Sequence, residues 1–174
     1  MRKWEIPRGF TLLELIITVS ILSVLVMIAI PSFQSVKERS QTERLATEMT
    51  GFFLLARSEA VLQNKTLYGH IDFPANGDHV SSNWSIQLTD SSIPLTGNVI
   101  QEFSGAAFRG LTVHHNYSSD QIAFEGIRGR AKSGTFKFFP SNDSGKQLEI
   151  RTSNPPGRVK VCATSEGLYG YKKC

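Results

Sequence analysis

The 174-residue sequence predicts an α+β protein in which one long N-terminal helix precedes a head rich in antiparallel strands. Two residue patterns along the chain predict this fold class. Apolar residues dominate positions 10–30 and then recur at spacings of three and four, as on one face of a helix. After Thr66 the apolar residues alternate with polar ones, which is the pattern of half-buried strands. Many short strands after one long helix favour a sheet packed against that helix.

The apolar stretch from Phe10 to Ile30 is long enough to cross a bilayer. It reads FTLLELIITVSILSVLVMIAI and carries one charged residue, Glu14. At 1.5 Å per residue, a helix of this length covers about 30 Å, the thickness of the hydrocarbon core. A charged carboxylate deep in a bilayer costs roughly 2.5–3.5 kcal/mol, so such a residue usually has a partner. Position alone leaves two interpretations open: Glu14 meets a partner, or it lies at the headgroup level and reaches water.

A short basic leader precedes this stretch. Residues 1–9 read MRKWEIPRG, with Arg2, Lys3 and Arg8 as the cations. A secretory signal would place a small-residue cleavage site after the apolar run, and the residues there (AIPS, 29–32) form a poor one. The boundary between the polar and apolar parts instead reads Gly9-Phe10-Thr11-Leu12-Leu13-Glu14.

This boundary resembles the processing site of type IV prepilins and of type II secretion pseudopilins, and the resemblance extends from Gly9 to Pro31. It implies that a prepilin peptidase cuts after Gly9 and that the new N-terminal Phe10 is methylated. It further implies that Glu14 pairs with the N-terminal amine of a neighbouring subunit during filament assembly. The implied organisation is a type IV pilin-like fold with a leader (1–9), a membrane-spanning and filament-core helix (10–30) and a globular head (31–174).

The helix is expected to continue into the head, to about residue 64. Its second part has one apolar face, formed by Leu45, Met49, Phe52, Phe53, Ala56 and Ala60. Pro31 can kink the helix because its ring removes a backbone donor and clashes with the preceding turn. The residues 56–60, ARSEA, resemble the helix end of the GspH/FimT group of minor pseudopilins and minor pilins.

Eight strands are expected after the helix. Turn residues such as Asn76-Gly77 and Asn154-Pro155-Pro156-Gly157 separate them. The expected strands are Thr66–Phe73, Trp84–Leu88, Val99–Phe103, Leu111–His115, Gln121–Phe124, Thr135–Phe139, Gln147–Arg151 and Arg158–Cys162.

Charge is unevenly distributed along the chain. The formal net charge is +4, but residues 126–174 hold ten basic and three acidic side chains and are therefore strongly basic. Such asymmetry points to a polyanionic partner.

Two glycine-containing basic stretches lie in this region, Gly126-Ile127-Arg128-Gly129-Arg130 and Gly157-Arg158-Val159-Lys160. Arginine side chains beside glycine suit contacts with phosphate oxygens, which are independent of base sequence and sensitive to salt. The second stretch resembles a Gly-Arg-x-Arg motif tied to DNA capture in the FimT minor pilins. Lys160 departs from that motif, keeping the charge but losing the bidentate fork. The alternative is that Arg158 and Lys160 are solvated residues at a strand start. Arg128 and Arg130 can add phosphate contacts only if folding brings their loop beside Gly157.

The two cysteines, Cys162 and Cys174, are expected to form a disulfide in a head on the oxidising side of the membrane. Neither a metal site nor a cofactor is expected, because no histidine or further cysteine stands at ligand spacing nearby. The sequence holds no recognisable nucleophile elbow, Walker-type glycine loop or zinc-binding helix motif, so an enzyme is not expected.

The residues and the resemblance together indicate a minor pilin of the GspH/FimT group. It would sit in the bacterial inner membrane with a periplasmic head, then join a type IV pilus or its initiating tip complex. Its partners would be prepilin peptidase and, through the N-terminal helix, other pilins. Two alternatives stay open: a pseudopilin of a type II secretion system, and a receptor for double-stranded DNA in natural transformation.

Overall fold

The computed structural model describes residues 9–155 and 157–174; the predicted leader, apart from Gly9, lies outside the described residues. The first element is the 51-residue helix α1 (Leu12–Leu62), which is continuous through Pro31. Two compact units divide the chain, the first ending at Lys37 and the second extending from Glu38 to Cys174. The second unit is called the head below.

The end of α1 has a clear stereochemical cause. Asn64 adopts a left-handed conformation with φ of 48°. The Lys65 backbone N–H then donates to the carbonyl of Ala60 at 3.1 Å, which closes the last turn in a Schellman-type cap. The helix end predicted near residue 64 is thereby confirmed.

Within the head, α1 buries the predicted apolar face. Leu45, Met49, Phe53, Ala56 and Ala60 are completely buried. Their spacing of three and four residues places them on one side of the helix, where they face the sheets.

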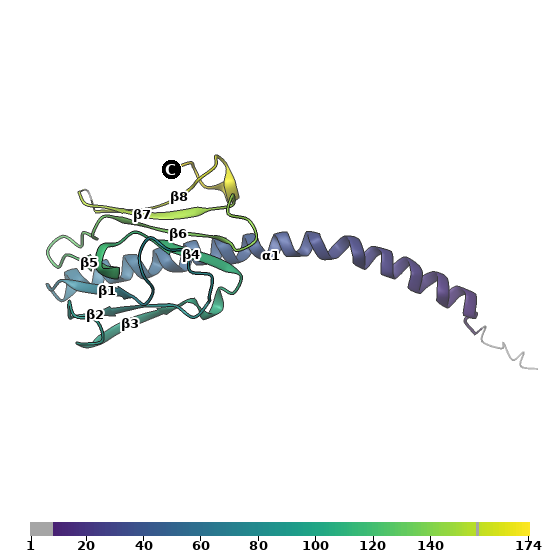
Figure 1. Cartoon of the computed structure of the whole chain (residues 1–174), viewed down its shortest axis with the longest axis horizontal. Helices are drawn as coiled ribbons and strands as arrows, with labels where there is room; N and C mark the ends of the chain where they lie inside the picture. The colour runs from purple at the N-terminus through teal and green to yellow at the C-terminus, as the bar shows by residue number, and fades with distance from the viewer. Residues whose placement is uncertain (1–8, 156) are drawn as a thin grey trace, which may run out of the picture. The chain divides into compact units, whose positions relative to one another are not determined.

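All eight predicted strands are present (Figure 1). They are β1 (Leu67–Ile71), β2 (Ser85–Thr89), β3 (Val99–Ser104), β4 (Leu111–His115), β5 (Gln121–Phe124), β6 (Gly134–Pro140), β7 (Leu148–Ser153) and β8 (Arg158–Ala163). Three short 3-10 helices, Gly105–Ala107, Ser118–Asp120 and Leu168–Gly170, lie between or after them.

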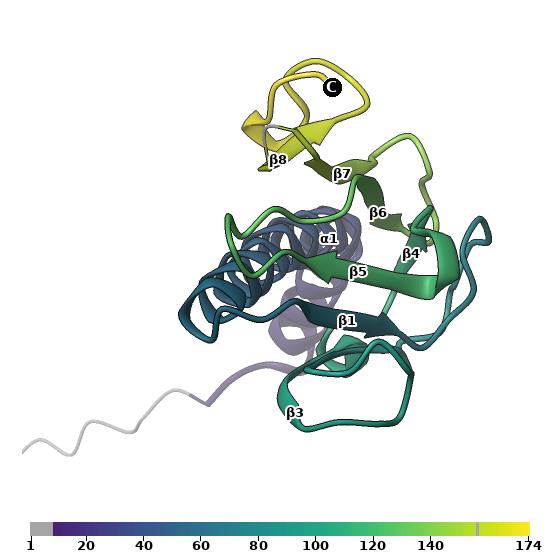
Figure 2. The same cartoon turned by 90° about the vertical axis from the view of Figure 1, so that its left-hand side faces the viewer.

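The strands form two four-stranded sheets. Sheet A has the order β3-β2-β1-β5 and sheet B the order β4-β6-β7-β8. Every pairing between these strands is antiparallel. β5 joins sheet A although it lies between β4 and β6 in sequence, so the chain crosses from one sheet to the other twice in this region (Figure 2).

A continuous aromatic core connects α1 with both sheets. Phe52 of α1 contacts Phe103 of β3, with ring centroids 5.8 Å apart. Trp84, which directly precedes β2, contacts Phe136 of β6 at 5.7 Å and so joins the two sheets. Trp84 is 2% exposed, which agrees with its position at the start of a predicted strand with an inward-facing apolar side.

Candidate functional site

The amino-terminal segment begins outside the helix. Gly9 and Phe10 are exposed and precede α1. The side chain of Thr11 caps the helix, because its Oγ1 accepts a hydrogen bond from the Glu14 backbone N–H at 3.2 Å. Thr11 and Glu14 have the spacing of a capping box, which places the Glu14 carboxylate in the first helical turn, where the helix dipole favours a negative charge. The Thr-x-x-Glu pattern is visible in the sequence, although Thr11 was not predicted as a cap.

The apolar part of α1 exposes side chains on every side of the helix. Large apolar residues from Leu12 to Ile28 are about half exposed or more in the isolated chain. In the described part of the chain, α1 is the one helix long and apolar enough to cross a membrane, with a mean hydropathy of 2.7 in its most apolar window. The hydroxyls of Thr18, Ser20 and Ser23 donate to backbone carbonyls one turn earlier, at 2.7–2.9 Å. These polar groups therefore need no water, and the segment suits either lipid or other apolar helices.

The two basic glycine stretches lie beside each other in the fold, and Arg130 of the first stretch makes the contact. Gly157, in the turn between β7 and β8, has a positive φ of 78°, and a Cβ atom there would lie 2.9 Å from Cγ of Arg130. The Arg130 side chain thus lies against Gly157 and next to the start of β8, where Arg158 is exposed. The folded loop therefore lies beside Gly157 at Arg130, which is the placement that added phosphate contacts would require.

Arg128 lies on a different side of its loop. It lines a shallow groove of about 420 Å³ with Leu54, Val61 and Leu62 of α1. Arg57 fixes this loop, because its Nε donates to the carbonyl oxygen of Gly129 at 2.7 Å. Arg128 is therefore held beside the helix end, whereas Arg130 faces the turn that precedes β8.

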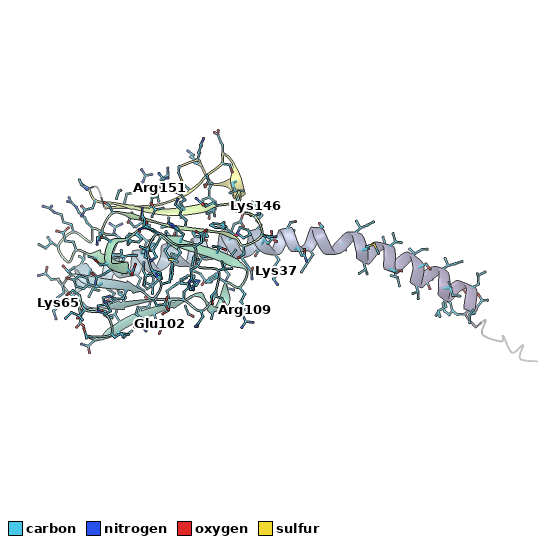
Figure 3. The ribbon with its side chains drawn as sticks, viewed as in Figure 1. Lys37, Lys65, Glu102, Arg109, Lys146 and Arg151 are labelled. Atoms are coloured by element: carbon cyan, nitrogen blue, oxygen red, sulfur yellow. A yellow bond between two sulfur atoms is a disulfide. The ribbon has the colours of Figure 1, made fainter. Side chains whose placement is uncertain are left out.

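The outward face of sheet B is also basic. Lys160 lies opposite Arg151 in the pairing of β8 with β7. Glu149, 7% exposed, holds Arg151 at 2.8 Å and Lys137 at 3.8 Å. Figure 3 shows Arg151 on the side of β7 turned away from α1. Among the described residues, Arg128, Arg130, Arg158 and Lys160 take part in no ion pair, and the same holds for Lys132, Lys172 and Lys173.

The predicted disulfide is present between Cys162 and Cys174, whose Cα atoms lie 5.0 Å apart. The two sulfurs and a Glu149 oxygen lie within 4.8 Å of one another. Because the sulfurs are bonded to each other, they offer no thiolates, and the trio lacks the ligands that a zinc-type site requires. The bridge instead fastens the C-terminal segment to β8, where the Ala163 N–H also donates to the carbonyl of Lys172 at 3.0 Å.

Comparison with known proteins agrees with these features. The sequence profile of a family described as "Type II transport protein GspH" matches residues 45–157, and that of the prokaryotic N-terminal methylation motif matches residues 7–30. A fimbrial protein of Pseudomonas aeruginosa is 40% identical over 60 residues, which cover 34% of this chain and 38% of that protein. A type IV major fimbrial protein, FimA, of Dichelobacter nodosus is 43% identical over 61 residues, covering 35% of this chain and 38% of FimA. These matches thus span well under half of either relative.

Two proteins of known structure share the fold. The type IV minor pilin FimU of Pseudomonas aeruginosa superimposes with a TM-score of 0.56 and 19% identity, over 74% of this chain and 93% of FimU. The minor pseudopilin EpsH of the type 2 secretion system of Vibrio cholerae superimposes with a TM-score of 0.55 and 16% identity, over 72% of this chain and 99% of EpsH.

The long apolar helix, the two-sheet head and the methylation motif define a type IV pilin-like protein, of the minor pilin and pseudopilin class. Within that class the chain belongs to the GspH family, whose profile covers most of the head. Members of this class are structural subunits that assemble with other pilins, and an apolar N-terminal helix fits membrane anchoring.

Proposed function

We propose that this protein is a minor pilin of a type IV pilus or of its initiating tip complex. In this proposal it enters the bacterial inner membrane through residues 10–30, with residues 31–174 in the periplasm. A prepilin peptidase then removes residues 1–9 by cutting between Gly9 and Phe10, and Phe10 is methylated. The protein acts by assembly, with neither a catalytic group nor a cofactor assigned.

The observation that carries this proposal is the position of Glu14, in the first turn of a helix whose apolar side chains are exposed. Cleavage after Gly9 would create a positive amine at Phe10, four residues before a carboxylate. A carboxylate in an apolar environment is stabilised by an opposite charge nearby. When helices of neighbouring subunits replace lipid around residues 10–30, the amine of one subunit can neutralise Glu14 of the next.

The test is the Glu14→Ala variant of the full-length chain, expressed in the cells that produce it. Removing the carboxylate should leave membrane insertion unchanged or improved, because a charge leaves the apolar segment. Incorporation into sheared filaments should fall strongly. Glu48→Ala is the matched control, since Glu48 is an exposed glutamate of the same helix that pairs with Arg44 on the surface. Normal incorporation of Glu14→Ala would refute the pairing role.

A pseudopilin role in a type II secretion system is the first alternative. Both kinds of apparatus contain proteins with this fold, as FimU and EpsH show. Deleting the gene separates the two roles: a pilus subunit should affect piliation and leave secreted proteins in the medium, whereas a pseudopilin should do the reverse. The genes beside it give a quicker indication.

Binding of double-stranded DNA is a second candidate function, and the contact between Gly157 and Arg130 favours it. That contact supports placing Arg130 and Arg158 together, with Lys160 farther along β8, and these cations take part in no ion pair among the described residues. Cations of this kind bind phosphate oxygens without reading base sequence. Arg128 could contact DNA only on the side of its loop that faces α1.

The DNA candidate is tested by titrating full-length protein in detergent with duplex DNA at two salt concentrations. Binding should weaken steeply with salt, and the Arg130→Ala, Arg158→Ala double variant should bind more weakly at low salt. Arg44→Ala serves as the control because Arg44 is an exposed arginine paired with Glu48. If the double variant binds like the unmodified protein, DNA does not bind at this cluster.

A further inference from the structure

The loop between β2 and β3, residues 90–98, holds apolar side chains out in solvent. Leu95 is 94% exposed and Ile93 is 63% exposed, and Val99 at the start of β3 is 58% exposed. Leu95 also has a positive φ of 61°, a conformation that is unfavourable for leucine and natural for glycine or asparagine. The loop therefore keeps a leucine where neither burial nor backbone preference explains it.

Hydrogen bonds inside the loop fix its shape. The Asp90 carboxylate accepts from the backbone N–H of Asn98 at 2.7 Å and from its side-chain Nδ2 at 3.2 Å. These bonds hold the pKa of the Asp90 carboxyl below its ordinary value. The Thr96 hydroxyl donates to the carbonyl oxygen of Ile93 at 2.7 Å. This arrangement requires glycine at position 97, where φ is 81° and a Cβ atom would lie 2.5 Å from Asp90 Oδ1.

Two side chains of sheet A fasten the loop to the solvent face of that sheet. Nε2 of His70 on β1 lies 2.9 Å from the carbonyl oxygen of Ser91, and Nε2 of Gln121 on β5 donates to the carbonyl oxygen of Ser92 at 2.9 Å. The loop is thus built and anchored before any partner arrives. A pre-organised apolar projection loses little conformational freedom on binding, which favours affinity.

Charge identifies the kind of surface that this projection fits. Residues 65–125, which contain sheet A, hold six acidic side chains and two basic ones, Arg109 and Lys65, the second close enough to act on Asp90. The exposed Glu102 on β3 and the exposed Asp72 flank sheet A, while residues 91–99 carry no charge. Figure 3 shows Glu102 and Arg151 in different layers of the head. A partner that complements this face has an apolar recess rimmed by cations, whereas a polyanion would be repelled.

We propose that Ile93, Leu95 and Val99 form a docking surface for the head of a neighbouring pilin-family subunit. This inference rests on the proposed filament role. The strongly basic stretch 126–174 of this same chain shows that a pilin-family head can carry the required cations. Contacts between an acidic surface and a basic one also fix the orientation of neighbouring heads in a filament. The projection supplies the central apolar anchor and the acidic rim selects the partner surface.

The test is site-specific photo-cross-linking in the cells that produce the filament. A benzophenone amino acid replaces Leu95 in the full-length chain. A second chain carries it at Leu25 of the apolar helix, and a third at Val80, an apolar residue outside the loop that is 61% exposed. Position 95 should cross-link to the head of a pilin-family subunit identified by mass spectrometry, and position 80 should not.

The three positions separate the two proposals. Cross-linking to a pilin-family subunit at position 25 but not at position 95 would overturn the docking surface and leave the filament role intact. Absence of cross-linking at positions 25 and 95 would overturn both the docking surface and the filament role. A cross-link from position 95 to a protein outside the pilin family would also overturn the docking surface.

A variant provides independent evidence. Leu95→Asn keeps a residue that tolerates positive φ while removing the apolar projection. Its thermal unfolding midpoint should equal or exceed that of the unmodified protein, and its recovery in sheared filaments should fall about tenfold. Val80→Asn is the matched control and should assemble normally. Normal assembly of Leu95→Asn would overturn the docking surface.

Discussion

Cγ of Arg130 lies so close to Gly157 that a Cβ atom on the glycine would stand 2.9 Å from it. The two residues come from separate turns, one after β5 and one between β7 and β8. Their contact selects Arg130, and not Arg128, as the companion of Arg158 at the start of β8. It also makes Gly157 sensitive to substitution, because its positive φ and the neighbouring Arg130 both exclude a side chain.

Replacing Gly157 with alanine should therefore destabilise the head by about 1–2 kcal/mol, because the new methyl group meets Arg130 and the positive φ disfavours alanine. Urea unfolding of the full-length protein in detergent measures this loss. Gly77→Ala is the control, since nothing lies within 4 Å of its Cβ position and its φ is not positive. Equal stability of the two variants would show that the Gly157 turn relaxes freely.

Much of the fold was predictable because local residue patterns determine it. Each observed strand begins and ends within two residues of the predicted one, since inward-facing residues such as Ile86 and Leu88 alternate with outward-facing ones. The division into two sheets was not predictable. It depends on β5 pairing with β1, where Ile122 lies opposite Gly69, and alternation along a strand does not say which strand lies beside it.

The candidate sites, like the fold, were predictable only in part. The Gly9-Phe10 boundary and Glu14 are recognisable from consecutive residues, and the sequence patterns also indicated the Cys162–Cys174 bridge. The separation of Arg130 from Arg128 required the folded loop, in which Arg57 binds the Gly129 carbonyl. The rigidity of the loop that carries Leu95 was equally hidden, because it arises from bonds to His70 and Gln121 in other strands.

Two variants can distinguish the helix-capping role of Thr11 from the charge-pairing role of Glu14. Thr11→Val removes the Oγ1 acceptor and should fray the first turn, at a cost of about 1 kcal/mol to the helix. Glu14→Gln keeps the size of the side chain and removes the charge. We expect Thr11→Val to reduce filament incorporation modestly and Glu14→Gln to reduce it strongly, as measured by immunoblotting of sheared filaments. Equal defects would mean that Glu14 acts mainly by ordering the helix start.

The Cys162–Cys174 bridge should stabilise the head by about 3 kcal/mol, the value expected from the loop that it closes. The Cys162→Ser, Cys174→Ser double variant should unfold at lower urea concentration, and reductant should have the same effect on the unmodified protein but none on the variant. Intact mass spectrometry should show the oxidised protein two daltons lighter than the reduced one. Two free thiols in periplasmic material would contradict the bridge.

His115 should make the stability of the head depend on pH. Its ring is completely buried, and Nε2 lies 2.9 Å from the carbonyl oxygen of Phe73, to which it donates. Burial lowers the pKa of His115 below its ordinary value of 6.5; the Phe73 carbonyl and Asp120 oppose this effect without cancelling it. Nδ1 has no hydrogen-bond partner among the described residues, so a proton placed there would find no acceptor. The unfolded chain consequently takes up this proton more readily than the folded protein.

The contribution of His115 to stability is therefore fully present above about pH 6.5 and decreases as the pH falls from there towards its lower folded-state pKa. We expect a lower free energy of unfolding at about pH 5.5 than at about pH 7.5. Most carboxylates remain ionised at both pH values, so they contribute little to this difference. His115→Gln should be less stable at both, because it loses the fitted ring, but should show a smaller difference between them. His114→Gln, at the adjacent and less buried position, should change the difference much less, because His114 is the smallest of the influences on the pKa of His115. An unchanged pH dependence in His115→Gln would assign it to other groups.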